Sequence, residues 1–466
     1  MGWTPDRASG TPLSKQIQGW ITDQIRQGVW PSGTRLPTQR KLAEQLKVNR
    51  STIVQVLDEL KAEGFLTSKV GSGVYVSSSG WENFLRNTSP DWRTRISQSD
   101  YQSNIQTIQL INEHEKNPDL IRLGTGELSP ELIPSDQIQH SLGEINLGSR
   151  DLGYSEPKGS LRLRQVLVRH LKKFNIKSLE ENILIVSGGL QALQLVSIGL
   201  IGSQANIYVG GPSYLHSLPS IPTENIHWHS ENSAPDAKNH SFFYTIPTLN
   251  NPTGTVLSVD ERQRILDRCK SLRLPIIEDG VYQELTFEEA PQSLKSLDLN
   301  GQVLHIGSMS KVFSPGLRVG WITGPQVVID HLADLKMQLD YGSSAISQEI
   351  AAQWLESNQY HQHLVQLRRS LKERAAYTEE ILTQHFMDIA TWNSPQGGFY
   401  IWLKVNKPVV TKTLFQRMIK RNVLINPGYI YDPGDYHHLR ISYAYSRYDE
   451  IEKGLLVLGE EIRKLM

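Results

Sequence analysis

The sequence predicts two units of different fold class: a mostly helical N-terminal unit that ends in a β-hairpin, and a larger α/β unit with a smaller C-terminal α+β lobe. Three observations lead to this expectation. Apolar residues recur at helical spacing in the first part of the chain. Strand-like apolar runs then alternate with helical patterns over most of the remainder. At 466 residues the chain is also too long for one ordinary core.

The N-terminal unit begins with a helix predicted over residues 13–27, where apolar residues form one stripe: Ile17, Trp20, Ile21 and Ile25. The stretch WPSGTRLPT then interrupts the helical pattern with two prolines and a glycine. Thr38, the last residue of that stretch, is placed to cap a second short helix, QRKLAEQL.

A third helix and a hairpin complete this unit. Ser51 is placed to cap the helix STIVQVLDELKAEG, which Gly64 ends. The following run, FLTSKVGSGVYV, contains two β-rich segments around Gly71, Ser72 and Gly73. Three helices and a glycine-tipped hairpin form a winged helix-turn-helix if the third helix is the recognition element.

Composition sets the expected domain limits. We expect the winged helix over residues 10–77, a polar linker over 78–117, helical in part near residues 105–112, and the α/β unit over 118–466. Its large lobe is expected at about 145–345 and its small lobe mainly at about 346–466. The large-lobe strands are predicted in NILIVSGG, ANIYVGG, HSFFYTIP, LPIIEDG and QVLHIGS, and the small-lobe strands in FYIWLKV and HLRISYAY.

Charge and cysteine content limit the possible partners and compartments. Basic and acidic side chains both number 48, so a nucleic-acid surface has to be local, and the first 78 residues do carry ten basic against six acidic side chains. A merely solvated basic face is the alternative. The single cysteine, Cys269, is expected to be a buried small hydrophobe in a reducing compartment.

We expect neither a signal peptide nor a membrane span, because polar residues interrupt the most apolar stretch, residues 182–202. The cytoplasm is therefore the expected location. No metal is inferred, and the nearby pair His361 and His363 is interpreted as surface.

The run GTRLPTQRKLAEQLKVNRSTIVQVLDELKAEGFLTSKVGSGVYV resembles the GntR-type winged helix over nearly its whole length. The resemblance implies binding to double-stranded DNA at a promoter operator, and a generic three-helix packing module is the alternative. Helix N-termini favour phosphate, and arginine can read a guanine edge. The candidate DNA contacts are Arg35, Thr38, Arg40, Arg50, Ser51, Thr52, Lys69, Gly71 and Ser72.

Polar residues follow the predicted large-lobe strands in an informative order. They lie after YVGGP, in NNPTG, in EDGVY and in GSMSK, and SPGLRVGW comes soon after. This order resembles the class I and II aminotransferases of fold type I from about Asp119 to the C-terminus. The resemblance implies pyridoxal 5′-phosphate as cofactor and a transferase fold. Any one of these motifs alone is weak.

The resemblance also implies a role for each residue. Lys311 would form the Schiff base, Asp279 would face the pyridine nitrogen, and Tyr214 would stack on the ring. Asn251 and Tyr282 would bind the phenolic oxygen. The phosphate would be held by the backbone of Gly188, Gly189 and Leu190, by Ser308 and Ser310, and by Arg318.

Two further residues follow from the same resemblance. Arg440 corresponds to the arginine that clamps an α-carboxylate, with a surface ion pair as the alternative. Tyr154 corresponds to a tyrosine that serves the phosphate of the neighbouring subunit, with a packed core tyrosine as the alternative. A homodimer is therefore expected, with its domains exchanged head to tail.

The combination of both units resembles the MocR subfamily of GntR-type regulators. It implies a pyridoxal-phosphate-dependent transcription regulator that senses an amine or amino acid. Two alternatives stay open: an active amino acid aminotransferase with an appended DNA-binding head, and a constitutive DNA-binding dimer with an inactive cofactor domain. The effector, the operator and the direction of regulation do not follow from the sequence.

Overall fold

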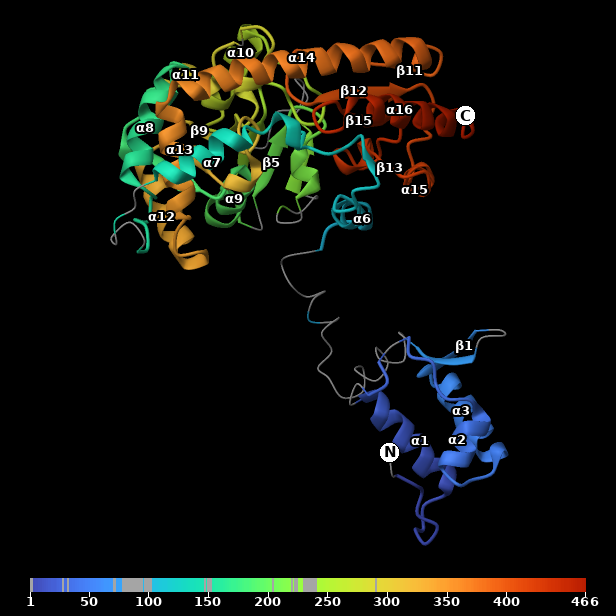
Figure 1. Cartoon of the computed structure of the whole chain (residues 1–466). Coiled ribbons are helices and arrows are strands. Elements are labelled where there is room, and N and C mark those ends of the chain that lie inside the picture. The colour runs from blue at the N-terminus through green and yellow to red at the C-terminus, as the bar shows by residue number, and fades with distance from the viewer. Residues whose placement is uncertain are drawn as a thin grey trace. The chain divides into compact units, whose positions relative to one another are not determined.

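The computed structural model describes residues 3–26, 29–31, 33–69, 73–77, 95, 103–145, 148, 153–202, 205–218, 221, 225–228, 241–289 and 291–466. The chain divides into two compact units, Met1–Gln102 and Ser103–Met466 (Figure 1).

The N-terminal unit has the predicted three helices and hairpin. Ile17 and Ile21 of the first helix pack with Ile53, Leu57 and other buried residues of the third, so the apolar stripes meet in one core. The elements are α1 (Leu13–Arg26), α2 (Gln39–Gln45), α3 (Arg50–Ala62), β1 (Leu66–Lys69) and β2 (Gly73–Val76), with β1 and β2 antiparallel.

The helix caps agree with the sequence at one site and differ at another. The hydroxyl of Thr38 accepts a hydrogen bond from the backbone N–H of Lys41 at 3.3 Å, as a capping residue does. The prediction that Ser51 caps the third helix is wrong. Helix α3 begins one residue earlier, at Arg50, and the extended residue before it is Asn49, whose side chain makes no capping bond.

The second unit is built on a seven-stranded sheet in the order β4-β10-β9-β8-β7-β5-β6. All neighbouring pairs are parallel except those made by β10, which the apolar runs did not predict. The strands are β4 (Ile183–Val186), β5 (Asn206–Val209), β6 (Ile226–Trp228), β7 (Ser241–Thr245), β8 (Ile276–Asp279), β9 (Val303–Ser308) and β10 (Gly320–Thr323).

Helices cover both faces of this sheet. Because successive strand residues point to opposite faces, Ile183 and Ile185 of β4 join one core and Leu184 and Val186 join another. The first core includes residues of α8 and α13, and the second includes residues of α9 and α12. The helices are α7 (Ser135–Glu144), α8 (Leu161–Lys172), α9 (Gly189–Val196), α10 (Val259–Ser271), α11 (Leu294–Leu297), α12 (Gln326–Leu339) and α13 (Ala345–Glu356).

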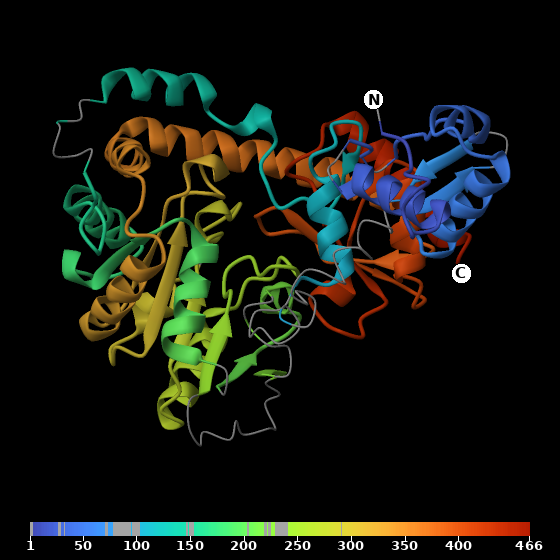
Figure 2. The ribbon, with the colours of Figure 1, turned by 90° about the horizontal axis from the view of Figure 1, so that it is seen from below.

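A long helix, α14 (Asn358–Phe386), runs from the large lobe to the small lobe (Figures 1 and 2). The small lobe has a four-stranded sheet in the order β11-β12-β15-β14 and a parallel pair, β13 with β3. Its elements are β3 (Ile121–Arg122), β11 (Ala390–Thr391), β12 (Tyr400–Val405), α15 (Lys412–Lys420), β13 (Val423–Leu424), β14 (Asn426–Pro427), β15 (His438–Ser442) and α16 (Tyr448–Arg463).

Helix α6 (Gln106–His114) lies in the stretch for which the sequence predicts a partly helical linker. Its Ile111 is buried in the main core of the second unit, and Thr107 shares a 3.2 Å hydrogen bond with the hydroxyl of Tyr429. It is therefore the first helix of the second unit along the chain. None of the described helices is long and apolar enough to cross a bilayer.

Candidate functional site

The described residues of the N-terminal unit that the sequence singles out lie mainly at the surface. Arg35, Arg40, Arg50 and Ser51 are exposed and Thr52 is half-buried. The Arg50 guanidinium donates to Gln39 Oε1 at 3.3 Å, which joins the first residues of α2 and α3. These two helix N-termini are thus held side by side, where phosphate and base contacts are expected.

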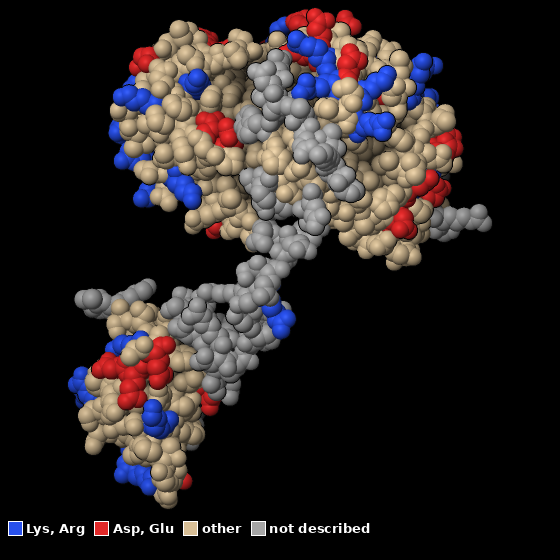
Figure 3. Space-filling view, turned by 180° about the vertical axis from the view of Figure 1, so that it is seen from behind, with Lys and Arg blue, Asp and Glu red and all other residues tan. Residues whose placement is uncertain are grey.

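One predicted DNA-contact residue, Arg35, lies beside the β1–β2 hairpin. Arg35 pairs with Tyr75 across an isolated bridge, and its Nε lies 3.0 Å from the position that a Cβ on Gly73 would take. The Arg35 side chain therefore lies across the start of β2. Gly71, Ser72 and the side chain of Lys69 fall outside the described residues. On the face shown in Figure 3, acidic side chains of this unit gather in one patch, so its basic charge does not coat it evenly.

In the second unit, Lys311 lies in the turn that follows β9, three residues after the end of that strand. Its Nζ donates to the backbone carbonyl of Gly126 at 2.7 Å and lies 5.8 Å from the centre of the Tyr282 ring. Tyr282 is buried, and its hydroxyl lies 3.0 Å from that of Tyr400. The structure thus brings Lys311 and Tyr282 together.

Asp279 ends strand β8 and is buried. Its Oδ2 accepts a 2.9 Å hydrogen bond from the hydroxyl of Tyr244, and its Oδ1 accepts one from the N–H of Val281 at 3.3 Å. Burial raises the pKa of Asp279, and the Tyr244 bond and the positive charge of Lys311 act in the opposite direction. Burial and the nearby Asp279 charge raise the pKa of Tyr214 to about 12, so Tyr214 is a neutral ring beside this carboxyl.

Arg440 lies on β15 and is buried between two aromatic rings. Its guanidinium carbon is 4.2 Å from the centre of the Tyr400 ring and 5.1 Å from that of Tyr431. It donates to Asn251 Oδ1 at 2.8 Å and to the carbonyl of Gly124 at 2.6 Å. Its buried Nε has no hydrogen-bond partner among the described residues. The alternative of a surface ion pair does not hold.

A cluster of hydrogen-bond donors lies where β4 and β9 end. Gly188 precedes α9 with a φ of +85°, and Arg318, with a φ of +55°, follows a short turn. The Arg318 guanidinium donates to the carbonyls of Ser187 and Pro315. A Cβ on Gly188 would lie 3.0 Å from Arg318 Nη2. Glycine is therefore required here both by the backbone conformation and by the close guanidinium.

Two observations are what a phosphate group held by these residues would require. The hydroxyl of Ser310 is buried and has no partner among the described residues, so it is a donor without an internal acceptor. The backbone of Gly188 approaches Arg318 in a way that any side chain would block. Ser308, by contrast, accepts from the N–H of Ser310 at 3.1 Å and lies 3.4 Å from the Val319 carbonyl.

Tyr154 is 84% exposed, so it is not the packed core tyrosine of the alternative. Its ring packs edge-on against Tyr341, which is 56% exposed. The exposed parts of both rings form an aromatic surface that a second molecule could contact.

Several residues around the site were missed by sequence reasoning. Tyr400 contacts both Tyr282 and Arg440, and Tyr244 donates a hydrogen bond to Asp279. The carbonyls of Gly124 and Gly126 accept hydrogen bonds from Arg440 and Lys311, respectively. Tyrosine at a strand position and glycine in a loop carry no distinctive signal in one sequence. The prediction that two histidines lie at the surface is confirmed for His361, which is exposed. It is wrong for His363, which is half-buried and has its Nε2 2.8 Å from the Val312 carbonyl.

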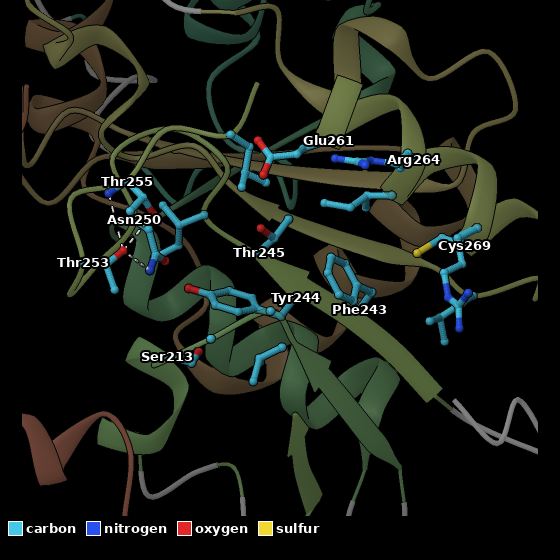
Figure 4. Close-up of a pocket in the computed structure, with 18 of the residues that line it drawn as sticks. Ser213, Phe243, Tyr244, Thr245, Asn250, Thr253, Thr255, Glu261, Arg264 and Cys269 are labelled. Carbon is cyan, nitrogen blue, oxygen red and sulfur yellow. Dashed lines mark hydrogen bonds between the residues drawn. The ribbon is translucent and has the colours of Figure 1, made fainter. Parts of the chain in front are cut away.

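A cavity of about 800 Å³ lies between β7 and α10 and is lined by Phe243, Tyr244, Arg264 and Cys269, among other residues (Figure 4). None of the predicted cofactor residues lines it. Cys269 is buried, as the sequence predicts, and burial raises its pKa to about 12. No group of three potential metal ligands occurs among the described histidines, cysteines and acids.

Comparison with known proteins matches both units. Residues 118–457 match the family "Aminotransferase class I and II", and residues 13–76 match "Bacterial regulatory proteins, gntR family". The HTH-type transcriptional regulator YisV of Bacillus subtilis is 43% identical over all of this chain and 99% of its own length. NorG of Staphylococcus aureus N315, also an HTH-type transcriptional regulator, is 35% identical over 92% of this chain and all of its own.

Solved structures match the fold of the second unit. A multiple substrate aminotransferase from Thermococcus profundus has a TM-score of 0.73 at 23% identity, and covers 81% of this chain and 99% of its own. The α-aminoadipate aminotransferase LysN of Thermus thermophilus, solved with N-(5′-phosphopyridoxyl)-L-leucine, has a TM-score of 0.69 at 25% identity, with 82% and 98% covered.

Proposed function

Because this chain belongs to the class I and II aminotransferase family and carries a GntR-family helix-turn-helix head, in the architecture of MocR-type transcription regulators, we propose that it is a regulator whose DNA binding responds to an amine or amino acid held with pyridoxal phosphate. The phosphate would be held by Ser310, Arg318 and the backbone at Gly188, and Lys311 would hold the aldehyde carbon. When bound, the cofactor supplies a carbonyl group that reacts reversibly with amines.

The observation that carries the proposal is the state of Arg440. A buried guanidinium is costly unless it is paired. The buried Nε of Arg440 has no partner among the described residues, and its two hydrogen bonds go to neutral oxygens. A planar carboxylate can take two parallel hydrogen bonds from such a group. The site therefore suits a ligand that carries both an amine and a carboxylate.

Arg440→Lys tests this assignment. Lysine keeps the positive charge and loses the planar pair of donors. We expect the variant to bind pyridoxal phosphate as the parent does and to lose at least about tenfold in affinity for amino acids, the effect of about 1.4 kcal/mol. Its response to amines without a carboxylate should be unchanged. Equal amino acid affinity in the variant and the parent, measured from the absorbance of the bound cofactor, would remove Arg440 from this role.

We also propose a homodimer in which Tyr154 donates to the phosphate site of the partner. The high exposure of Tyr154 and Tyr341 supports this, because large aromatic side chains at a surface are characteristic of interfaces. Head-to-tail exchange of the winged helices is part of the same proposal. Symmetric dimers are also the usual way of reading two half-sites on DNA.

Mixed dimers give a sharp test of shared sites. Lys311→Ala and Tyr154→Phe each damage cofactor binding when pure. In a mixed dimer, the chain with the Tyr154 change keeps its Lys311 and receives an intact Tyr154 from its partner, so one of the two sites is complete. Cofactor affinity should then return at one of the two sites of each mixed dimer, which is about a quarter of all sites when the chains recombine at random. A mixture that behaves as the average of the two pure variants would contradict the shared site.

The second candidate function is amino acid transamination. It is favoured by the presence of Lys311, Asp279 and Arg440 around one site. Kinetics with a 2-oxo acid acceptor distinguish the two functions, because a sensor needs reversible binding and an enzyme needs turnover. The third candidate, a constitutive DNA-binding dimer, would show no change in DNA affinity with any amine.

A further inference from the structure

The segment Gly124–Gly126 covers the site from the small lobe. The backbone carbonyls at its two ends accept hydrogen bonds from the two side chains that would bind a ligand. The Gly124 carbonyl accepts from the Arg440 guanidinium at 2.6 Å, and the Gly126 carbonyl accepts from the Lys311 amine at 2.7 Å. A carboxylate that binds Arg440 competes with the first carbonyl. A carbonyl compound that reacts with Lys311 competes with the second. Both groups are therefore hydrogen-bonded to carbonyls of this one short segment.

The segment is anchored firmly on both sides. Leu123 bonds the Leu424 carbonyl at 2.9 Å, and Ser129 bonds the Ala444 carbonyl at 2.9 Å. Its glycines leave no room for side chains, since a Cβ on Gly126 would lie 2.6 Å from the Tyr400 hydroxyl. A movement that frees the carbonyls is thus confined to the few residues between these anchors.

One side chain holds the middle of the segment. Thr125 is 1% exposed, and its hydroxyl donates to Glu115 Oε1 at 3.0 Å. Glu115 follows α6 directly, and its N–H bonds the Ile111 carbonyl at 2.8 Å in the last turn. A single hydrogen bond therefore connects the segment that closes the site to the first helix of the second unit.

We propose that Glu115 and Thr125 are positioning residues that hold the Gly124–Gly126 segment over Lys311 and Arg440. Ligand binding then requires the hydrogen bond between Thr125 and Glu115 to weaken. Because Glu115 directly follows α6, this helix would be the first element to move. The proposal rests on the proposed function, since it names the internal competitor of the ligand and the route by which occupancy reaches the chain leading to the winged helix. The hydrogen bond from the Thr125 hydroxyl to the Glu115 carboxyl group is strong enough to hold the segment in place. It is also weak enough for a bound ligand to break.

The test compares Thr125→Val, which keeps the shape and removes the hydroxyl, with Thr125→Ser, which keeps the hydroxyl. Thr378→Val is the matched control, because Thr378 is also buried and bonds the Arg374 carbonyl within α14, remote in sequence from the segment. The first measurement uses the protein without cofactor. Thr125→Val should speed the hydrogen exchange of amides in residues 124–127 and 106–115, whereas the serine variant and the Thr378 control should match the parent.

The second measurement is a titration with pyridoxal phosphate itself. Thr125→Val should bind it about threefold to tenfold more tightly, because the segment yields Lys311 more easily. Unchanged or weaker binding by Thr125→Val, or the same change in Thr125→Ser, would overturn the proposal. If the parent binds no pyridoxal phosphate, the proposed function fails. The exchange experiment alone then decides the proposal: faster exchange confined to Thr125→Val supports it, and unchanged exchange overturns it.

Discussion

Tyr244 donates its hydroxyl to Asp279 Oδ2 at 2.9 Å, and both side chains are buried. This bond lowers the pKa of Asp279 against the effect of burial. Tyr244→Phe removes it, so the carboxyl becomes a weaker partner for a protonated pyridine nitrogen. We expect pyridoxal phosphate to bind about tenfold more weakly, the effect of one hydrogen bond to a charged group. Fluorescence titration measures this. Tyr377→Phe, which loses a surface bond to Glu452, should leave the affinity unchanged.

Gly188→Ala separates backbone strain from loss of the phosphate pocket. The new Cβ would meet the Arg318 guanidinium at 3.0 to 3.2 Å and would also require a φ of +85°. Gly202 has a φ of +64° with nothing near its Cβ position, so Gly202→Ala carries the strain alone. Gly202→Ala should lose about 1 kcal/mol of stability from strain, and Gly188→Ala should lose at least as much. Only Gly188→Ala should lose affinity for pyridoxal phosphate. Equal affinities in the two variants would show that the contact between the new Cβ and Arg318 does not disturb cofactor binding.

Glu284 predicts a pH dependence of stability. It is buried and binds His170 Nε2 at 3.2 Å and the Tyr360 hydroxyl at 3.0 Å. Burial alone would raise its pKa, but the interactions with His170 and Tyr360 outweigh burial and lower the pKa below its ordinary value of 4.5. A lowered carboxyl pKa stabilises the fold above the unfolded pKa, and this stability is lost as the pH falls through the folded pKa.

Glu284→Gln should therefore unfold at a lower temperature than the parent near pH 7, by about 2–4 °C for each kcal/mol lost. The loss is expected to be about 1–3 kcal/mol. The difference should narrow as the pH falls below 4.5, where the parent also loses the charge. A difference that is constant from pH 7 to strongly acidic solution would show that the ionised form contributes nothing.

The winged helix predicts two different effects on DNA binding. Arg50→Ala should lose about 1–3 kcal/mol of discrimination between DNA sequences if the arginine reads a base, because the guanidinium offers two donors to a guanine edge.

Lys69→Ala should weaken binding to all DNA sequences and reduce the slope of log affinity against log salt concentration by about 1 if the lysine contacts phosphate. Binding curves on a DNA fragment selected from random sequences, over a salt series, distinguish the two. Unchanged binding by Arg50→Ala would place this residue outside the interface.

Elements with a strong local signal could be predicted from the sequence. The apolar runs gave five strands of the large sheet and the two long strands of the small lobe, since buried strands need continuous apolar residues. Strand β10 was missed because its residues, GWIT, include a glycine and a threonine and so form no continuous apolar run. The start of α3 was misplaced because Asn49 and Ser51 are both good capping residues, and only the backbone conformation decides between them.

The candidate site could be predicted only where a motif marked it. Lys311, Asp279, Asn251 and Arg440 stand in motifs with a recognisable order, and the structure places them around one site. The contacts of Arg440 could not be predicted, because Gly124, Tyr400 and Tyr431 reach it from segments far apart in the chain. Such contacts depend on tertiary packing and have no local pattern.

The most direct test of the central claim is the DNA affinity of the parent and of Lys311→Ala, each with and without an amino acid that changes the absorbance of the bound cofactor. The fragment selected from random sequences serves as the probe. We expect the amino acid to change the parent's DNA affinity by about 5-fold to 150-fold, the usual range for coupling between two sites. Lys311→Ala should bind the DNA as the parent does without the amino acid and should not respond to it. An undiminished response of Lys311→Ala would contradict a sensor that acts through this lysine.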